Sequence, residues 1–232
     1  MKALLVLGVT AAAALSSPAL ATNLLTNGSF EDGLASWTVT HSVGTAPVAI
    51  SYNNPANYPD GAFGTPIGTN SVGSASPDAV GKSLLYFSSD NNGVGALDSV
   101  SQSFDAIAGH TYNIGFDYYA PANGLANPND AAFGLAIGGV IIGATAIKGY
   151  IPGDNWFNYA TTYTAKTTGK ISYDILFAGL GATSTSYAAD IAIDRAYVTQ
   201  AVPEPATWAM MLGGMMIVGT AMRRRRTAVS FG

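Results

Sequence analysis

The feature that most constrains this chain is the pattern of its apolar residues between Thr22 and Gln200. Apolar side chains there alternate with polar ones or form short runs, and turn residues end each run. Residues 100–104 and 111–118 alternate most clearly, and they are separated by the turn Ala108-Gly109-His110. No apolar pattern with a 3.6-residue period is long enough for a substantial helix. The pattern predicts an all-β domain.

About ten short strands are expected, and two sequence signals predict how some of them connect. Gly138-Gly139 lies between two apolar runs and predicts a tight hairpin, since both turn positions need positive φ. Residues 166–169 separate two further strands and predict a second hairpin. Short strands at this spacing favour a jelly-roll β-sandwich over residues 22–201. The expected strands are 37–40, 48–52, 83–87, 100–104, 111–118, 133–137, 140–142, 157–165, 170–177 and 189–199.

Composition narrows the classes of function. Only 10% of the residues are charged, against about 25% in a typical soluble domain, and there is no cysteine. Disulfides, thiolate catalysis and cysteine metal sites are therefore excluded. Residues 22–201 contain thirteen acidic and five basic residues, a net charge of −8. Nucleic-acid binding needs clustered Lys and Arg, so we expect no nucleic-acid partner.

The N-terminal 21 residues have the pattern of a secretory signal. Lys2 precedes the apolar run 3–15, and Ala19-Leu20-Ala21 supplies the small residues at positions Ala19 and Ala21 that signal peptidase requires. We expect a signal peptide at 1–21, cleavage after Ala21 and export through the inner membrane. An uncleaved membrane anchor is the alternative.

Residues 202–232 form a second distinctive segment. Pro203, Glu204 and Pro205 precede seventeen uncharged residues, 206–222, and the bases Arg223, Arg224, Arg225 and Arg226 follow at once. Seventeen helical residues span about 25 Å, so the run predicts a short transmembrane helix at about 206–222. Arginine-rich flanks stay cytoplasmic, which predicts a transient anchor with a cytoplasmic C-terminus and the acidic domain outside.

This tripeptide, apolar run and arginine cluster, in that order, resemble the PEP-CTERM sorting signal of exported bacterial proteins. The resemblance implies recognition by an exosortase-type membrane protease and removal of the tail. The domain is then released or transferred to the cell surface, as in bacteria that make extracellular polysaccharide and biofilm matrix. An ordinary single-pass anchor that is never cut is the alternative.

The domain itself resembles the galactose-binding-like jelly rolls, including family 4/9-type carbohydrate-binding modules. The residues that carry the resemblance are Asn27-Gly28-Ser29-Phe30-Glu31, Trp37, residues 109–116 and Ile193-Asp194. The resemblance implies a structural Ca²⁺ held by Glu31 and Asp194, with a carbonyl from Gly28 or Ser29. The alternative is a solvated Glu31, with Asp194 paired to Arg195 or capping a turn. The family's sugar-stacking aromatics have no identifiable counterparts here.

Catalytic signatures are missing from the sequence. Glu31 is the only glutamate in residues 22–201, His41 and His110 are the only imidazoles, and no nucleophile elbow, zinc motif or phosphate-binding loop occurs. We therefore expect no catalytic residues, no enzyme activity and no cofactor apart from Ca²⁺.

Ligand contacts are expected from loops rich in Tyr, Asn, Asp and Gly, at 52–58 and 120–130, although such residues are also ordinary loop residues. Trp37 and Trp156 are expected in the core. The sequence thus favours a non-catalytic surface or matrix protein that adheres to extracellular polysaccharide. A secreted polysaccharide-active enzyme and a purely structural coat component are the alternatives.

Overall fold

The computed structural model describes most of the domain and part of the C-terminal segment. Residues 22–201 form one compact unit, and residues 1–21 group with 202–232 in another. The described residues are 21–42, 46–51, 75, 83–89, 97–119, 131–146, 155–179, 189–201 and 205–225.

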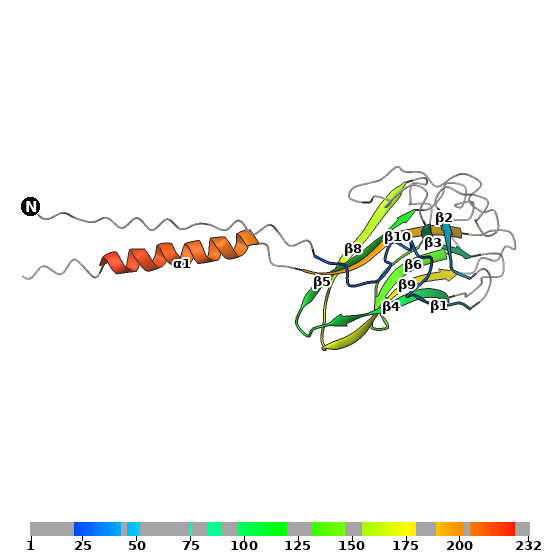
Figure 1. Ribbon diagram of the computed structural model, residues 1–232, viewed down its shortest axis with the longest axis horizontal. Coiled ribbons are helices and arrows are strands. Elements are labelled where there is room, and N and C mark those ends of the chain that lie inside the picture. The colour runs from blue at the N-terminus through cyan, green and yellow to red at the C-terminus, as the bar shows by residue number, and fades with distance from the viewer. Residues whose placement is uncertain are drawn as a thin grey trace, which may run out of the picture. The chain divides into compact units, whose positions relative to one another are not determined.

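The domain is built from two antiparallel sheets of five strands each, which confirms the predicted all-β sandwich (Figure 1). One sheet has the order β1-β4-β9-β6-β7, and the other has the order β2-β3-β10-β5-β8. We call them the first and second sheet. The strands are β1 (Thr38–Thr40), β2 (Val48–Ser51), β3 (Ser83–Ser89), β4 (Leu97–Ala106), β5 (Thr111–Tyr119), β6 (Ala131–Ile137), β7 (Val140–Ala146), β8 (Trp156–Thr164), β9 (Gly169–Gly179) and β10 (Ala189–Gln200).

The hairpin predicted at Gly138-Gly139 is present. It joins β6 to β7, and both glycines have positive φ, 58° and 77°. A two-residue turn of this kind matches the right-handed twist of the flanking strands, and glycine adopts it without steric cost.

The second predicted hairpin is wrong. The strands on either side of residues 166–169 exist, but β8 pairs with β5 in the second sheet, while β9 pairs with β4 and β6 in the first. The connection therefore crosses from one sheet to the other. It lies beside the connection between β4 and β5, which crosses too: Gly109 N donates to the Ala165 carbonyl at 2.8 Å, and Ala165 N donates to the His110 carbonyl at 3.0 Å.

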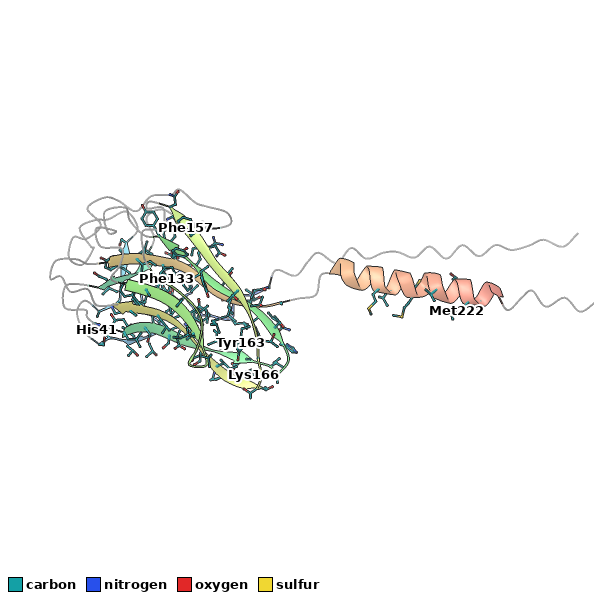
Figure 2. All side chains as sticks on the ribbon, turned by 180° about the vertical axis from the view of Figure 1, so that it is seen from behind. His41, Phe133, Phe157, Tyr163, Lys166 and Met222 are labelled. Carbon is teal, nitrogen blue, oxygen red and sulfur yellow. The ribbon has the colours of Figure 1, made fainter. Side chains whose placement is uncertain are left out.

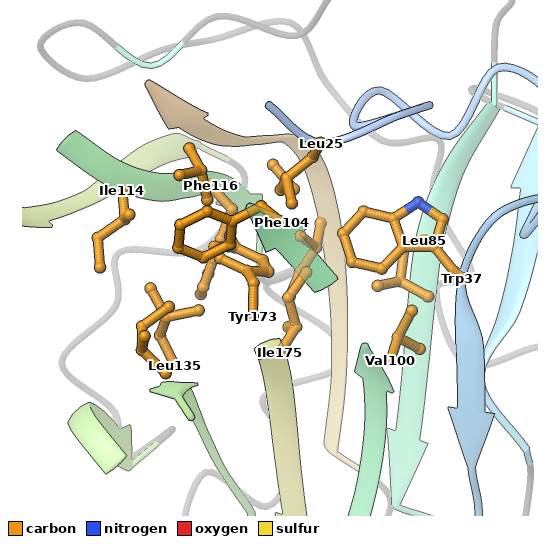
Figure 3. Packing of buried hydrophobic residues seen from close by; sticks show 14 of the residues in the cluster. Leu25, Trp37, Leu85, Val100, Phe104, Ile114, Phe116, Leu135, Tyr173 and Ile175 are labelled. Carbon is orange, nitrogen blue, oxygen red and sulfur yellow. The ribbon is translucent and has the colours of Figure 1, made fainter. Parts of the chain in front are cut away.

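The core lies between the two sheets and is rich in aromatic side chains (Figure 3). Trp37 packs beside Leu85 and Val100, whose strands belong to opposite sheets. Phe87 and Phe177 stack across the same core with ring centroids 5.4 Å apart. Trp37 and Trp156 are 8% and 0% exposed, so both tryptophans are buried as predicted.

A second, smaller apolar cluster lies on the other face of the second sheet. Val48, Tyr86, Ala192, Tyr119 and Trp156 occupy successive cross-strand positions on all five strands. Directly opposite residues share a face, so this row crosses the whole sheet on the side away from the main core. At this row of residues, the second sheet is therefore buried on both faces.

The first described loop, residues 23–37, is fastened to both sheets. The side chain of Gln102 on β4 accepts a hydrogen bond from Thr26 N and donates to the carbonyls of Thr26 and Ser36. On the other side, Asn23 Nδ2 donates to the Ala196 carbonyl at 2.9 Å, and its Oδ1 accepts from Val198 N at 3.0 Å. The loop therefore closes one side of the sandwich with polar contacts.

The C-terminal unit contains one described helix, α1 (Pro205–Arg225). No helix in the described part of the chain combines the length and apolar character needed to cross a membrane. The transmembrane helix predicted at about 206–222 is therefore not supported. The uncharged run of seventeen residues includes Gly213, Gly214 and Gly219, which add no apolar side chain. Its span of about 25 Å is also short of a hydrocarbon core of about 30 Å.

Candidate functional site

A group of polar side chains lies on the outer face of the second sheet, next to the Trp156 row. Asp194, Asp117 and Asn158 occupy directly opposite positions on β10, β5 and β8. They are two residues along each strand from Ala192, Tyr119 and Trp156, so they point to the same side as that row. The site combines Asp117, Asn158, Asp194, Arg195 and Tyr197, and we call it the outer-face cluster.

Asp117 is the centre of the outer-face cluster. Its side chain is 1% exposed, and it accepts a hydrogen bond of 2.6 Å from Asn158 Nδ2 and one of 3.0 Å from Arg195 Nη1. Arg195 is 39% exposed. A buried carboxylate needs partners of this kind, because an ionised group without them is strongly destabilised. The pair therefore fixes a guanidinium at the protein surface in one orientation.

A β-bulge in β10 determines which side chains reach this face. Between Asp194 and Tyr197 the strand advances three residues while β5 advances two, and Arg195 has a φ of 50°. Before the bulge, Ile191 and Ile193 face the core. After it, Ala196 and Val198 do. One extra residue reverses the alternation, so Tyr197 points outward instead of into the core.

The first loop fixes this bulge in place. Ala196 N donates to the Gly28 carbonyl at 2.8 Å, and a Cβ on Gly28 would collide with the Ala196 carbonyl oxygen. Glycine is needed here for the close approach of the two backbones. Non-glycine residues in the left-handed region are strained, and such positions are enriched at functional sites. The outer-face cluster thus rests on a strained residue held by surrounding structure.

Tyr197 lies across the neighbouring strand. A Cβ on Gly115, its direct partner on β5, would meet the phenol end of the Tyr197 ring. The half-buried ring therefore occupies the space that a larger residue would fill. Burial raises the pKa of Tyr197; its hydrogen bond to Asn158 and the Arg195 charge oppose the rise, while the Asp117 charge adds to it. The ring thus stays neutral and is anchored at its hydroxyl end.

This arrangement suits recognition of a sugar. An aromatic ring offers an apolar face, and amide, carboxylate and guanidinium groups offer fixed hydrogen-bond donors and acceptors. Sugars present both kinds of surface. The outer-face cluster places a tyrosine ring, an amide and a charged pair together on one rigid sheet.

The residues predicted to hold Ca²⁺ lie in different environments. Glu31 is exposed, while Asp194 is 3% exposed and accepts a hydrogen bond of 2.7 Å from Arg195 N. The Gly28 carbonyl is engaged by Ala196 N. The described residues contain no group of three or more His, Cys, Asp or Glu suited to a metal. The Glu31–Asp194 site stays a prediction.

Several other predicted residues lie outside the described part of the chain. These are the loops 52–58 and 120–130, together with Ala19, Pro203, Glu204 and Arg226. Pro205, Arg223, Arg224 and Arg225 belong to α1, and Ala21 directly precedes the compact domain.

Most residues of the outer-face cluster carry no local signal in the sequence. Arg195 is the only arginine in residues 22–201 and directly follows Asp194, and Asp117 stands among aromatic residues. Those two charged positions are the features of the sequence that point to the cluster. Nothing local indicates that Tyr197 and Asn158 join them, since their strands are brought together only by the sheet.

No family model and no curated protein matches the sequence. Among solved structures, the carbohydrate-binding module TmCBM61 in complex with β-1,4-galactotriose is 17% identical, with 78% of this chain and 99% of that chain covered and a TM-score of 0.50. The Stig cyclase Fisc from Fischerella sp. TAU is 12% identical, with coverages of 80% and 100% and a TM-score of 0.51. A family 4 carbohydrate-binding module is 15% identical, with coverages of 76% and 99% and a TM-score of 0.39. The chain therefore shares its sandwich fold with a sugar-binding module and with a cyclase.

Proposed function

We propose that this protein is a non-catalytic, exported surface or matrix protein whose β-sandwich binds polysaccharide through the outer-face cluster. The observation that carries the proposal is the Tyr197 ring lying over Gly115 and hydrogen-bonded to Asn158, beside the Asp117–Arg195 pair. The ring supplies a stacking surface, and the polar groups supply orientation. The shared fold with a carbohydrate-binding module solved in complex with β-1,4-galactotriose supports this reading without assigning the same ligand.

The direct test is binding of the full chain to a panel of soluble polysaccharides, with β-1,4-galactotriose as one defined probe. Tyr197→Ala is expected to weaken binding about tenfold, or about 1.4 kcal/mol, whereas Tyr197→Phe keeps the ring and most of the affinity. Val140→Ala is the matched control, since Val140 is 65% exposed on β7 in the first sheet. Absence of glycan binding by the unmodified chain, or equal binding by Tyr197→Ala, contradicts the proposal.

Hydrolysis is the second candidate, because Asp117 and Asp194 lie directly opposite each other on neighbouring strands. Glycoside hydrolysis uses two carboxyl groups flanking the bond that is cut. Here, however, Asp117 and Asp194 both accept hydrogen bonds from N–H donors, and Asp117 is also paired with a guanidinium. Both carboxylates are thus engaged by donors of the protein itself, whereas one group of a hydrolytic pair must donate a proton to the glycosidic oxygen. Release of reducing ends from the panel, abolished by both Asp117→Asn and Asp194→Asn, would favour the enzyme.

Export and sorting complete the proposal and rest on the sequence. The signal-peptide pattern of residues 1–21 and the PEP-CTERM-like segment 202–232 support export, processing by an exosortase-type protease and delivery to the surface. Intact mass of the protein from its native envelope and medium tests this. A species beginning at Thr22 and ending near Pro203 is expected, whereas retention of Arg223 to Arg226 contradicts tail removal.

A further inference from the structure

A strip of uncharged side chains continues the outer-face cluster along the same three strands. Beyond the Asp194–Asp117–Asn158 level, the next outward positions are Tyr197, Gly115 and Ala160 on β10, β5 and β8. The level after that contains Thr199, Asn113 and Thr162, and the last contains Thr111 and Thr164. We call these three levels the outer strip.

The side chains of the outer strip are on the same face as Tyr197. Their neighbours along the strands, Tyr112, Ile114 and Val198, are buried in the main core, so the alternation turns the strip residues outward. A hydrogen bond of 3.0 Å between the hydroxyls of Thr111 and Thr164 ties the last level together.

The outer strip is accessible and has the chemistry of a sugar-contacting surface. Asn113, Ala160, Thr162 and Thr164 are exposed, and Thr199 is partly exposed. Amide and hydroxyl groups both donate and accept hydrogen bonds, as sugar hydroxyls do. Each level is two residues from the next, so the three levels span about 13 Å along the strands at about 3.3 Å per residue. That length exceeds a single sugar ring.

We infer that the sugar-binding site is elongated and that the outer strip holds additional units of a neutral polysaccharide chain, aligned along β5 and β8. Tyr197 stacks against one ring, and Asn113 and Thr162 contact the next. None of the strip residues is charged, so this part of the site offers no fixed partner for an anionic sugar. The inference rests on the proposed function, because it extends the same site.

The test measures binding of the full chain to β-1,4-galacto-oligosaccharides and to cello-oligosaccharides of one to six units. In the series that binds, affinity is expected to rise with length over the first three or four units. Asn113→Ala and Thr162→Val are expected to weaken binding of the longest oligosaccharide about three- to tenfold and leave the shortest bound ligand unaffected. Thr38→Val, on the exposed edge strand β1 of the first sheet, is the control.

The outcomes separate this inference from the proposed function. Binding that does not increase with length, or that is unchanged in both strip variants, overturns the elongated site while leaving sugar binding at Tyr197 intact. Loss of affinity for the shortest ligand in the strip variants also overturns it, because the strip would then be part of the first contact. If the chain binds neither oligosaccharide series and no polysaccharide in the panel, the proposed function and the elongated site are both rejected.

Discussion

The guanidinium of Arg195 donates a hydrogen bond of 3.0 Å to the carboxylate of Asp117, which is 1% exposed and lies on the neighbouring strand. This contact joins a buried charge to a partly exposed one at the position where β10 bulges. The contact holds the polar part of the outer-face cluster in place on the paired strands β10, β5 and β8. A change at this pair is therefore expected to alter both the stability of the domain and the geometry of the proposed binding site.

Breaking the Arg195–Asp117 pair is expected to destabilise the domain. Arg195→Met removes the guanidinium from a buried carboxylate and should lower the free energy of unfolding by about 1–3 kcal/mol. Asp117→Asn keeps a side-chain oxygen that can accept a hydrogen bond from Asn158 but removes the negative charge. In the Asp117→Asn background, Arg195→Met should therefore lower the free energy of unfolding by a smaller amount. Urea unfolding of the four proteins in a double-mutant cycle measures the difference. Strictly additive effects would show that the pair contributes no coupling energy.

Gly115→Ala is expected to disturb both the sheet and the site. Its new Cβ would collide with the Tyr159 carbonyl oxygen and with the Tyr197 ring. Overpacking of this kind costs about 1–3 kcal/mol, and displacement of the ring should weaken glycan binding as Tyr197→Ala does. Thermal unfolding and glycan titration measure the two effects.

Ala144→Gly, at an exposed position on β7 in the first sheet, is the control for Gly115→Ala. It should cost no more than about 1 kcal/mol. A fully stable Gly115→Ala protein with unchanged binding would contradict the close packing of Tyr197 on Gly115.

Gln102→Ala is expected to loosen the first loop without unfolding the sandwich. Three hydrogen bonds to Thr26 and Ser36 disappear, and because they are exposed to solvent the expected loss is about 1–2 kcal/mol. Hydrogen exchange should accelerate at the amide of Thr26. Ser103→Ala, the next and exposed residue of β4, is the control. Identical exchange in both variants would argue against fastening by Gln102.

Tyr173 predicts how stability responds to alkali. The side chain is buried and its hydroxyl donates to the Gly115 carbonyl at 2.7 Å. Burial, with smaller contributions from Tyr197 and Tyr159, raises the pKa of Tyr173 well above its usual value. The folded state therefore holds this proton more tightly than the unfolded state, whose tyrosine pKa is about 10. The contribution of neutral Tyr173 to the free energy of unfolding is fully present below about pH 10. It is lost as the pH rises towards the pKa of Tyr173 in the folded state.

Tyr173→Phe tests this directly. The variant should be about 1 kcal/mol less stable at pH 7 because one buried hydrogen bond is missing. Its unfolding free energy should then fall less steeply than that of the unmodified protein between pH 9 and 11, as measured by urea titrations at each pH. Parallel pH profiles for the two proteins would show that Tyr173 does not ionise on unfolding in this range.

Local sequence pattern was enough to predict the strands. Alternation in residues 111–118 corresponds to β5, and the Gly138-Gly139 turn corresponds to the β6–β7 hairpin. Both depend on interactions within a few residues, such as side-chain alternation and the φ preference of glycine. The β8–β9 connection could not be assigned in this way, because a short turn between two strands looks the same whether they pair or enter different sheets. Figure 2 shows Phe157 and Lys166 towards opposite ends of the sandwich, with the crossing connection at the Lys166 end.

The sequence by itself determined the all-β class, the positions of the strands, the burial of Trp37 and Trp156, and one hairpin. The tertiary structure alone decided the site. Tyr197 faces outward only because one extra residue at the Arg195 bulge reverses the alternation of β10, and it meets Gly115 and Asn158 only because β10, β5 and β8 pair in that order. Alternation is set by neighbouring residues, whereas register and bulges are set by partners about 40 to 80 residues away in the chain.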